Sequence, residues 1–191
     1  ILFMPDSMIA VSDTFFVRQE SGYPDIRNGR TIERWYPYQD SMQVAQMKDG
    51  HPFQMYHNDA LLYGYVALRP AGASATGKAQ IKEGTLQSPH FTLSTSEMDA
   101  RVSSFQLRST VYNSIAFEAT NMKSHVDYTK RRADFLANAN IEHTKLPLLR
   151  YMAEVDKFSW EMDKKQLEFQ LTHGECVALG IECSRYGDQT W

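Results

Sequence analysis

The stretch from Leu146 to Gly174, LPLLRYMAEVDKFSWEMDKKQLEFQLTHG, constrains the fold of this 191-residue chain more than any other. Val155, Phe158, Met162 and Phe169 recur within it at spacings of three, four and seven residues. This spacing is typical of the buried face of an α-helix, because side chains three and four residues apart share one face. We therefore expect one long amphipathic helix here.

Residues at both ends of this stretch suit the ends of a helix. Pro147 stands where a first helical turn tolerates a missing N–H, and Gly174 stands where a left-handed cap ends a helix. A second apolar set, Trp160, Leu167 and Leu171, lies off the first stripe. The helix is thus expected to contact neighbours on more than one side.

Glycine and proline divide the chain unequally. Of the seventeen, thirteen lie in residues 1–89, Pro147 is the only one in residues 90–173, and three glycines follow. Because both residues punctuate turns and are costly inside helices, the first half is expected to be loop-rich and the second to contain longer regular elements.

Short apolar runs predict strands in residues 8–17 and 61–70, although Asn58-Asp59 could equally start a helix at the second run. Over residues 96–121 helical and alternating patterns compete, and we favour strands there while a helix stays open. After Met122, charges of alternating sign at helical spacing (Lys123, Asp127, Lys130 and Asp134) predict a helix. A short link would join it to the Pro147 helix as an antiparallel pair.

The resulting prediction is an α+β fold. Residues 1–121 would form a loop-rich, strand-containing part, and residues 122–191 a helical hairpin with an apolar tail, together in one structural unit. A mainly α fold is the runner-up.

Composition excludes some classes of function. With 42% apolar and 12% aromatic residues the chain is not of a disordered type. Its net charge of −3 gives no global reason to expect nucleic acid as a partner, and acidic residues interrupt the one basic cluster, Lys130-Arg131-Arg132.

The sequence contains no run of eighteen apolar residues, so no membrane span is predicted. Two cysteines and no glycosylation sequon favour a cytoplasmic or virion-associated location over secretion. The start at Ile1 is expected of a trimmed product or a piece of a longer protein.

Residues 72–78, GASATGK, match the GxxxxGK pattern of a phosphate-binding loop. Lys78 is the residue that would reach a phosphate. The next residue is Ala79, which has no hydroxyl for Mg²⁺, and a flexible surface loop is the simpler interpretation. A nucleotide-binding module is therefore the second alternative function.

The string His173-Gly-Glu-Cys-Val-Ala-Leu-Gly180 is the most specific in the chain. It resembles the His-Gly-Glu-x-Val-Ala-x-Gly segment of 3-dehydroquinate synthases and related sugar-phosphate cyclases, in which the histidine is a zinc ligand. The resemblance covers eight residues, and the upstream Gly-His-x-x-Gly-His segment of that family is missing. It implies His173 as a zinc ligand and a metal-dependent enzyme as the first alternative. The alternative to a zinc site is a purely structural role for this segment, in which Gly174 ends a helix and no cofactor is bound.

Aromatic residues in the loop-rich half suggest the favoured function. Trp35, Tyr36, Phe53 and Tyr56 are of the types enriched in the cores of protein interfaces. We therefore expect a non-catalytic structural or interaction protein, a subunit of a larger assembly such as a virion or multiprotein complex. Its partners would be other proteins or further copies of itself.

Overall fold

The computed structural model describes residues 2–4, 7–19, 22–47, 50–138, 144–164 and 166–170. These residues form antiparallel β-strands and one 3-10 helix, η1 (Pro37–Gln39). In chain order the strands are β1 (Leu2–Met4), β2 (Ser7–Ser12), β3 (Phe15–Val17), β4 (Ile26–Asn28), β5 (Thr31–Tyr36), β6 (Ser41–Gln46), β7 (Phe53–Met55), β8 (Ala60–Arg69), β9 (Gly72–Ile81), β10 (Gly84–Leu93), β11 (Glu97–Arg108), β12 (Ile115–Asp127), β13 (Arg132–Ala137), β14 (Thr144–Leu146), β15 (Tyr151–Ala153), β16 (Lys157–Glu161) and β17 (Gln166–Gln170).

The α+β prediction is wrong, and so is its mainly α runner-up. The described part of the Leu146–Gly174 stretch contains β15 and a hairpin of β16 and β17, in which Phe158 pairs with Phe169 and Trp160 with Leu167. Alternation within each arm brings these four side chains to one face. The apolar residues whose spacing predicted a helix lie on different strands and in the segments between the strands. Spacings of three, four and seven residues across these elements therefore do not reflect a helical period.

The helix predicted after Met122 is a hairpin as well. β12 and β13 pair through Lys123 with Leu136 and Val126 with Ala133. The boundary expected between residues 121 and 122 falls inside β12, so a single strand crosses it. Among the described residues, no helix has the length and apolarity needed to cross a membrane.

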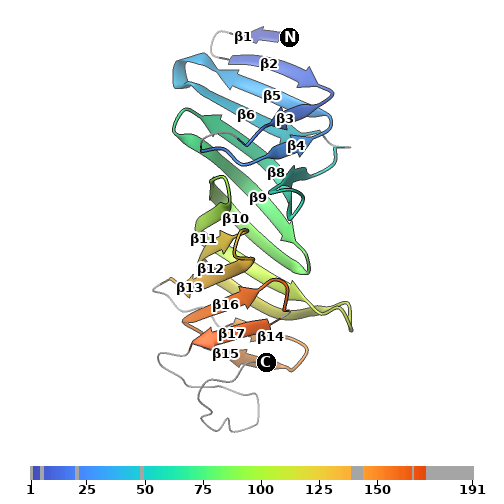
Figure 1. The fold of residues 1–191 in the computed structure, drawn as a ribbon, viewed down its shortest axis with the longest axis vertical. Coiled ribbons are helices and arrows are strands. Elements are labelled where there is room, and N and C mark those ends of the chain that lie inside the picture. Colours follow the sequence, from blue (N-terminus) through green and yellow to red (C-terminus); the bar gives the residue numbers. More distant parts are fainter. Residues whose placement is uncertain are drawn as a thin grey trace.

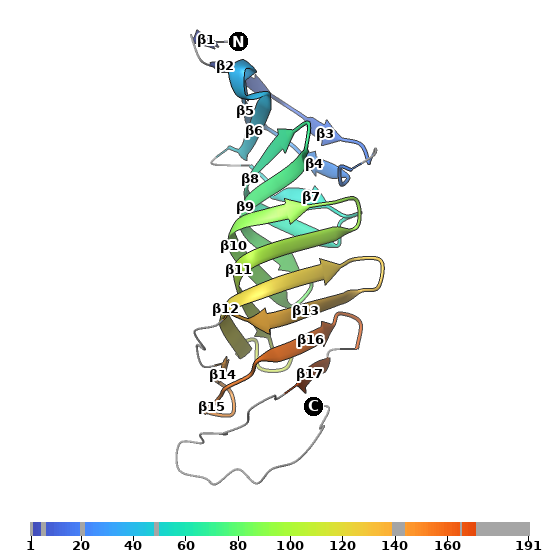
Figure 2. The same cartoon turned by 90° about the vertical axis from the view of Figure 1, so that its left-hand side faces the viewer.

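Hydrogen bonds join the seventeen strands into one sheet, which forks at two places (Figures 1 and 2). The five longest strands, β8 to β12, pair in chain order in its middle. β8 uses its second edge for β7 near its start and for β6 near its end. β12 likewise pairs with β14 near its start and β13 near its end. Each fork therefore begins two layers.

The strands on either side of the two forks form two layers. The first layer runs from β3, β4 and β7 through one half of each central strand to β14 and β15. The second layer runs from β1, β2, β5 and β6 through the other halves to β13, β16 and β17. Each central strand thus contributes to both layers, which requires every one of them to bend.

Two glycines allow the bend in β8 and β9. Gly64 and Gly77 are cross-strand partners, and their φ angles are +152° and +136°. A Cβ on Gly64 would lie 2.0 Å from the carbonyl oxygen of Thr76, and a Cβ on Gly77 would lie 2.1 Å from that of Tyr63. Only glycine permits this approach of two backbones.

In β10 and β11 the bend is made by β-bulges. The pairing register shifts after Ser88 in β10 and after Ala100 in β11. The Ser88 hydroxyl donates to the carbonyl oxygen of Val102 at 2.7 Å, and the Ser103 hydroxyl donates to that of Met122 at 2.8 Å. A bulge bends its strand and disrupts the ladder locally, and these hydroxyls satisfy carbonyl groups there.

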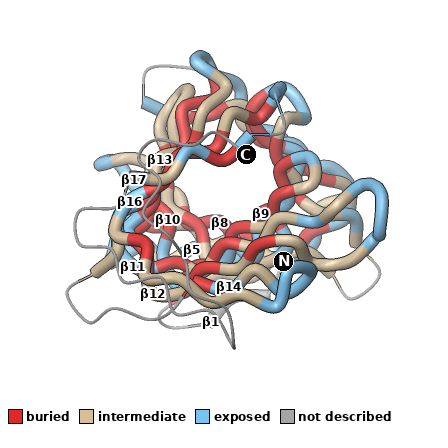
Figure 3. Tube along the Cα trace, turned by 90° about the horizontal axis from the view of Figure 1, so that it is seen from below, coloured by how far each residue is buried: buried red, intermediate tan, exposed pale blue. Residues whose placement is uncertain are grey.

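The core lies between the two layers, and buried residues line the inside of the folded sheet (Figure 3). Phe105 of the first layer lies 4.6 Å from Phe135 of the second, measured between ring centroids, and Phe117 lies 4.8 Å from Phe158. Trp160 lies 5.4 Å from Phe105. All five rings are at most 1% exposed, so their burial supplies much of the apolar area that folding removes from water.

Candidate functional site

One row of apolar side chains follows the inner face of the second layer across eleven strands. Each member is the cross-strand partner of the next. In order from β2 to β17 this inner row is Met8, Trp35, Met42, Leu68, Ala73, Leu93, Met98, Val126, Ala133, Trp160 and Leu167.

The inner row changes from buried to exposed towards the N-terminal strands. From Ala73 to Leu167 every member is at most 9% exposed. Leu68 and Met42 are half-buried, and Trp35 is 42% exposed. Among the described residues, the first layer has only the three-residue strands β3, β4 and β7 at this end, and they are too short to cover the face. Side chains of the core type are thus left facing solvent.

The four aromatic residues predicted for an interface occupy different places. Trp35 lies on the exposed end of the inner row, and Tyr36 is half-buried beside it on the opposite face of β5. Phe53 and Tyr56 are 0% and 4% exposed, so they are core residues and cannot meet a partner. Both lie in or next to β7, whose inner face packs on the core.

Lys78 does not belong to a phosphate-binding loop. Residues 72–78 lie in β9, and β9 pairs with β8 on one edge and β10 on the other. Lys78 itself is exposed between Tyr63 and Gln87. Because a phosphate loop needs its backbone N–H groups free to point at the ligand, this segment does not offer such a cradle.

His173 and the rest of the string up to Gly180 lie outside the described residues. Zinc at His173 therefore stays a prediction.

A group that the sequence did not reveal lies at the start of β11. Ligand atoms of Glu97, Asp99 and His125 all lie within 4.8 Å of one another, and Nδ1 of His125 lies 2.8 Å from Oδ1 of Asp99. Asp99 and His125 are cross-strand partners, 26 residues apart in the chain. These three half-exposed side chains are of the types that bind a divalent cation. Only the strand register brings them together.

Acidic residues neutralise the basic cluster Lys130–Arg132. The pairs are Lys130 with Asp127 at 2.8 Å, Arg131 with Asp59 at 2.7 Å and with Asp163 at 2.8 Å, and Arg132 with Asp134 at 3.0 Å. The pKa of Asp127 is lowered by its hydrogen bonds to Lys130. These contacts tie turns and strands together.

Comparison with protein-family models, curated proteins and solved structures found no match.

The Asp163 pairs predict a pH dependence of stability. Hydrogen bonds from Arg131 and Lys82 lower the pKa of Asp163 to about 2. Since this value lies below the ordinary one of 3.8, the pairs stabilise the fold above pH ~4 and stop doing so as the pH falls towards ~2. We expect Asp163→Asn to reduce the fall in Tm over this range, measured by circular dichroism. Asp13→Asn, at a side chain 97% exposed, is the control. An unchanged pH profile in Asp163→Asn would contradict this role.

Proposed function

We propose that this chain is a non-catalytic interaction protein, a subunit of a larger assembly, that binds a second copy of itself through the exposed end of the inner row. The observation that carries the proposal is Trp35, 42% exposed in a row whose members from Ala73 onwards are core residues. A second protein surface packed here would complete the two-layer arrangement that the rest of the row already has.

The chemistry of this end suits the centre of a protein interface. Trp35 is flanked on neighbouring strands by Met8 and Met42, and Leu68 follows Met42. Tryptophan and methionine are enriched in interface cores, and tryptophan is prominent among residues that dominate binding energy. The sheet holds these side chains in a fixed row, so little conformational entropy is lost when a partner binds.

The shifted pKa values do not indicate a catalytic centre among the described residues. The pKa of Asp163 is lowered by its pairing with Arg131, and the pKa values of Tyr56 and Tyr128 are raised by burial. Tyr56 donates a hydrogen bond to the carbonyl oxygen of Glu97 and stacks on Tyr128, which are structural contacts. Perturbed groups of an active site would instead converge on a cleft.

Replacement of Trp35 tests the proposal. We expect native mass spectrometry and sedimentation of the purified wild type to show species heavier than the 21.9 kDa monomer. Trp35→Ala should weaken this association by about 2 kcal/mol or more, the scale of an interface hot spot. Its far-UV circular dichroism should match that of the wild type.

The matched control is Tyr38→Ala. Tyr38 is an aromatic residue 84% exposed in η1, near Trp35 in the chain but outside the inner row. It should leave association unchanged. A wild type that stays a 21.9 kDa monomer at every concentration, or equal losses in the two variants, would contradict the proposal.

A further inference from the structure

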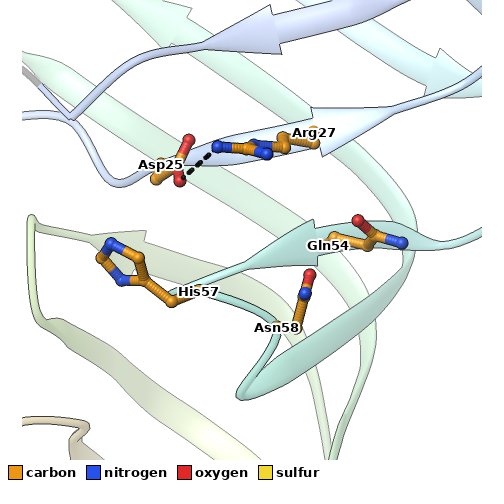
Figure 4. Close-up of a pocket in the computed structure, with 5 residues that line it drawn as sticks. All are labelled: Asp25, Arg27, Gln54, His57 and Asn58. Atoms are coloured by element: carbon orange, nitrogen blue, oxygen red, sulfur yellow. Dashed lines mark ion pairs between the residues drawn. The ribbon is translucent and has the colours of Figure 1, made fainter.

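A small polar pocket lies on the outer face of the first layer, where β4 pairs with β7 (Figure 4). Its five lining residues are all polar, namely Asp25, Arg27, Gln54, His57 and Asn58. Its volume of about 170 Å³ exceeds the space of a few water molecules and is smaller than a typical drug site. It is separate from the inner row, which faces the core side of the second layer.

The Asp25 carboxylate has one paired and one unpaired oxygen. Oδ2 lies 3.5 Å from a guanidinium nitrogen of Arg27, and the Asp25 side chain is 12% exposed. Oδ1 is buried and has no hydrogen-bond partner among the described residues. Because Oδ1 is enclosed by the protein, Oδ2, whose contact with Arg27 is long, is the oxygen that can accept a hydrogen bond from an O–H group of a ligand.

A strained turn holds the other side of the pocket in place. Tyr56, His57 and Asn58 have φ angles of 52°, 57° and 72°, three successive left-handed residues without a glycine. Such conformations are uncommon and cluster at binding sites. Tyr56 anchors the turn through its hydrogen bond to Glu97 at 2.7 Å and its ring stacked 3.9 Å from that of Tyr128. His57 and Asn58 are therefore positioned before any ligand binds.

The charges of the pocket favour a neutral ligand. Arg27 and Asp25 carry opposite charges and lie side by side, so an anion would meet the carboxylate and a cation would meet the guanidinium. The side-chain amides of Gln54 and Asn58 each offer hydrogen-bond donors and an acceptor, and a ring nitrogen of His57 can act as a donor or an acceptor. Hydroxyl groups, which donate and accept, match this mixture.

An exposed aromatic ring stands beside these polar groups. Phe16 of β3 is 46% exposed, is the cross-strand partner of Arg27, and lies under its guanidinium at 4.9 Å. Sugar rings combine hydroxyl edges with an apolar C–H face, and that face packs on aromatic rings. We propose that this pocket binds a neutral sugar ring. Asp25 accepts from a hydroxyl, Arg27 and Asn58 donate, and Phe16 borders the C–H face.

Saturation-transfer NMR with the full chain tests the proposal. The probes are glucose, galactose, mannose and N-acetylglucosamine, each as the free sugar and as its methyl glycoside, with inorganic phosphate and ethylammonium as charged controls. At least one sugar should bind saturably at millimolar concentration, and neither ion should bind. Preference for the methyl glycoside would indicate the end of a glycan, and preference for the free sugar a soluble monosaccharide.

Variants locate the binding. Asp25→Asn and Asn58→Gly should each raise the Kd at least tenfold, because the first replaces a charged acceptor by a neutral amide and the second leaves a ligand hydroxyl without its partner. Glycine suits the left-handed backbone at position 58, so Asn58→Gly removes the amide without adding strain. Asn113→Gly, also left-handed at φ 49° but outside the pocket, is the control and should leave the Kd unchanged. Absence of sugar binding, binding of phosphate instead, or an unchanged Kd in both pocket variants would overturn the proposal.

Discussion

Replacement of Gly77 by alanine is expected to remove a large part of the stability of the chain. The φ angle of +136° is strained for any L-residue, and the new Cβ would lie 2.1 Å from the carbonyl oxygen of Tyr63. Relief would require β8 and β9 to separate where both bend between the layers. We expect a loss above about 4 kcal/mol, a large part of the total stability of a domain this size. Urea unfolding followed by circular dichroism measures it.

Alanine variants at two other glycines distinguish the cost of backbone strain from the cost of overlap between the new Cβ and its neighbours. Gly72 has a φ of +129°, and a Cβ added there would have no neighbouring atom within 4 Å, so Gly72→Ala should cost about 1–2 kcal/mol from backbone strain alone. Gly29 has neither an unusual φ nor a close neighbour, and Gly29→Ala should change stability by less than about 1 kcal/mol. If Gly77→Ala costs no more than Gly72→Ala, the close approach of the two backbones does not limit the fold.

The sequence predicted some strands of the first half, but not the strand β9 or its bend. The apolar run 61–70 predicted β8, and the runs within 8–17 predicted β2 and β3, because alternation and flanking turn residues mark strands. Residues 72–78 suggested a loop because small residues and two glycines are common in loops. Gly64 inside an apolar run was the available signal, since a glycine in a strand often marks close backbone approach.

The C-terminal half misled because periodicity is ambiguous across a hairpin. Phe158 and Trp160 alternate in one arm, and Leu167 and Phe169 alternate in the other. Joined through a turn, they imitate a helix with two apolar sets. The second apolar set of the predicted helix, which includes Trp160 and Leu167, did not fit a single helical stripe. That misfit was the sequence evidence for strands.

The candidate site depends on register, which a single sequence does not supply. Trp35 was predicted as an interface residue from its residue type, but its exposure follows from the short strands opposite it. Phe53 and Tyr56 share that type and are buried, because β7 packs on the core. Asp99 and His125 meet only through the pairing of β11 with β12.

Replacement of Trp160 by alanine is expected to cost about 3–5 kcal/mol, the range for deletion of a large buried side chain. Trp160 is 1% exposed and packs against Phe105 at 5.4 Å between ring centroids. The matched control is Trp35→Ala, the same change at the exposed end of the same row. At a protein concentration low enough that the chain is monomeric, it should cost less than about 1 kcal/mol by urea unfolding. Equal losses would contradict the view that the inner row is core at one end and surface at the other.

Gly84 tests the same contact from the opposite layer. A Cβ on Gly84 would lie 2.6 Å from Cη2 of Trp160, so Gly84→Ala should cost about 1–3 kcal/mol through overpacking. Phenylalanine lacks the outer atoms of the indole, so Trp160→Phe makes room for the new methyl group. The double variant should therefore lose less stability than the sum of the two single variants. Strict additivity would mean that the indole does not fill the space that glycine leaves, and the two layers would then be joined by other contacts.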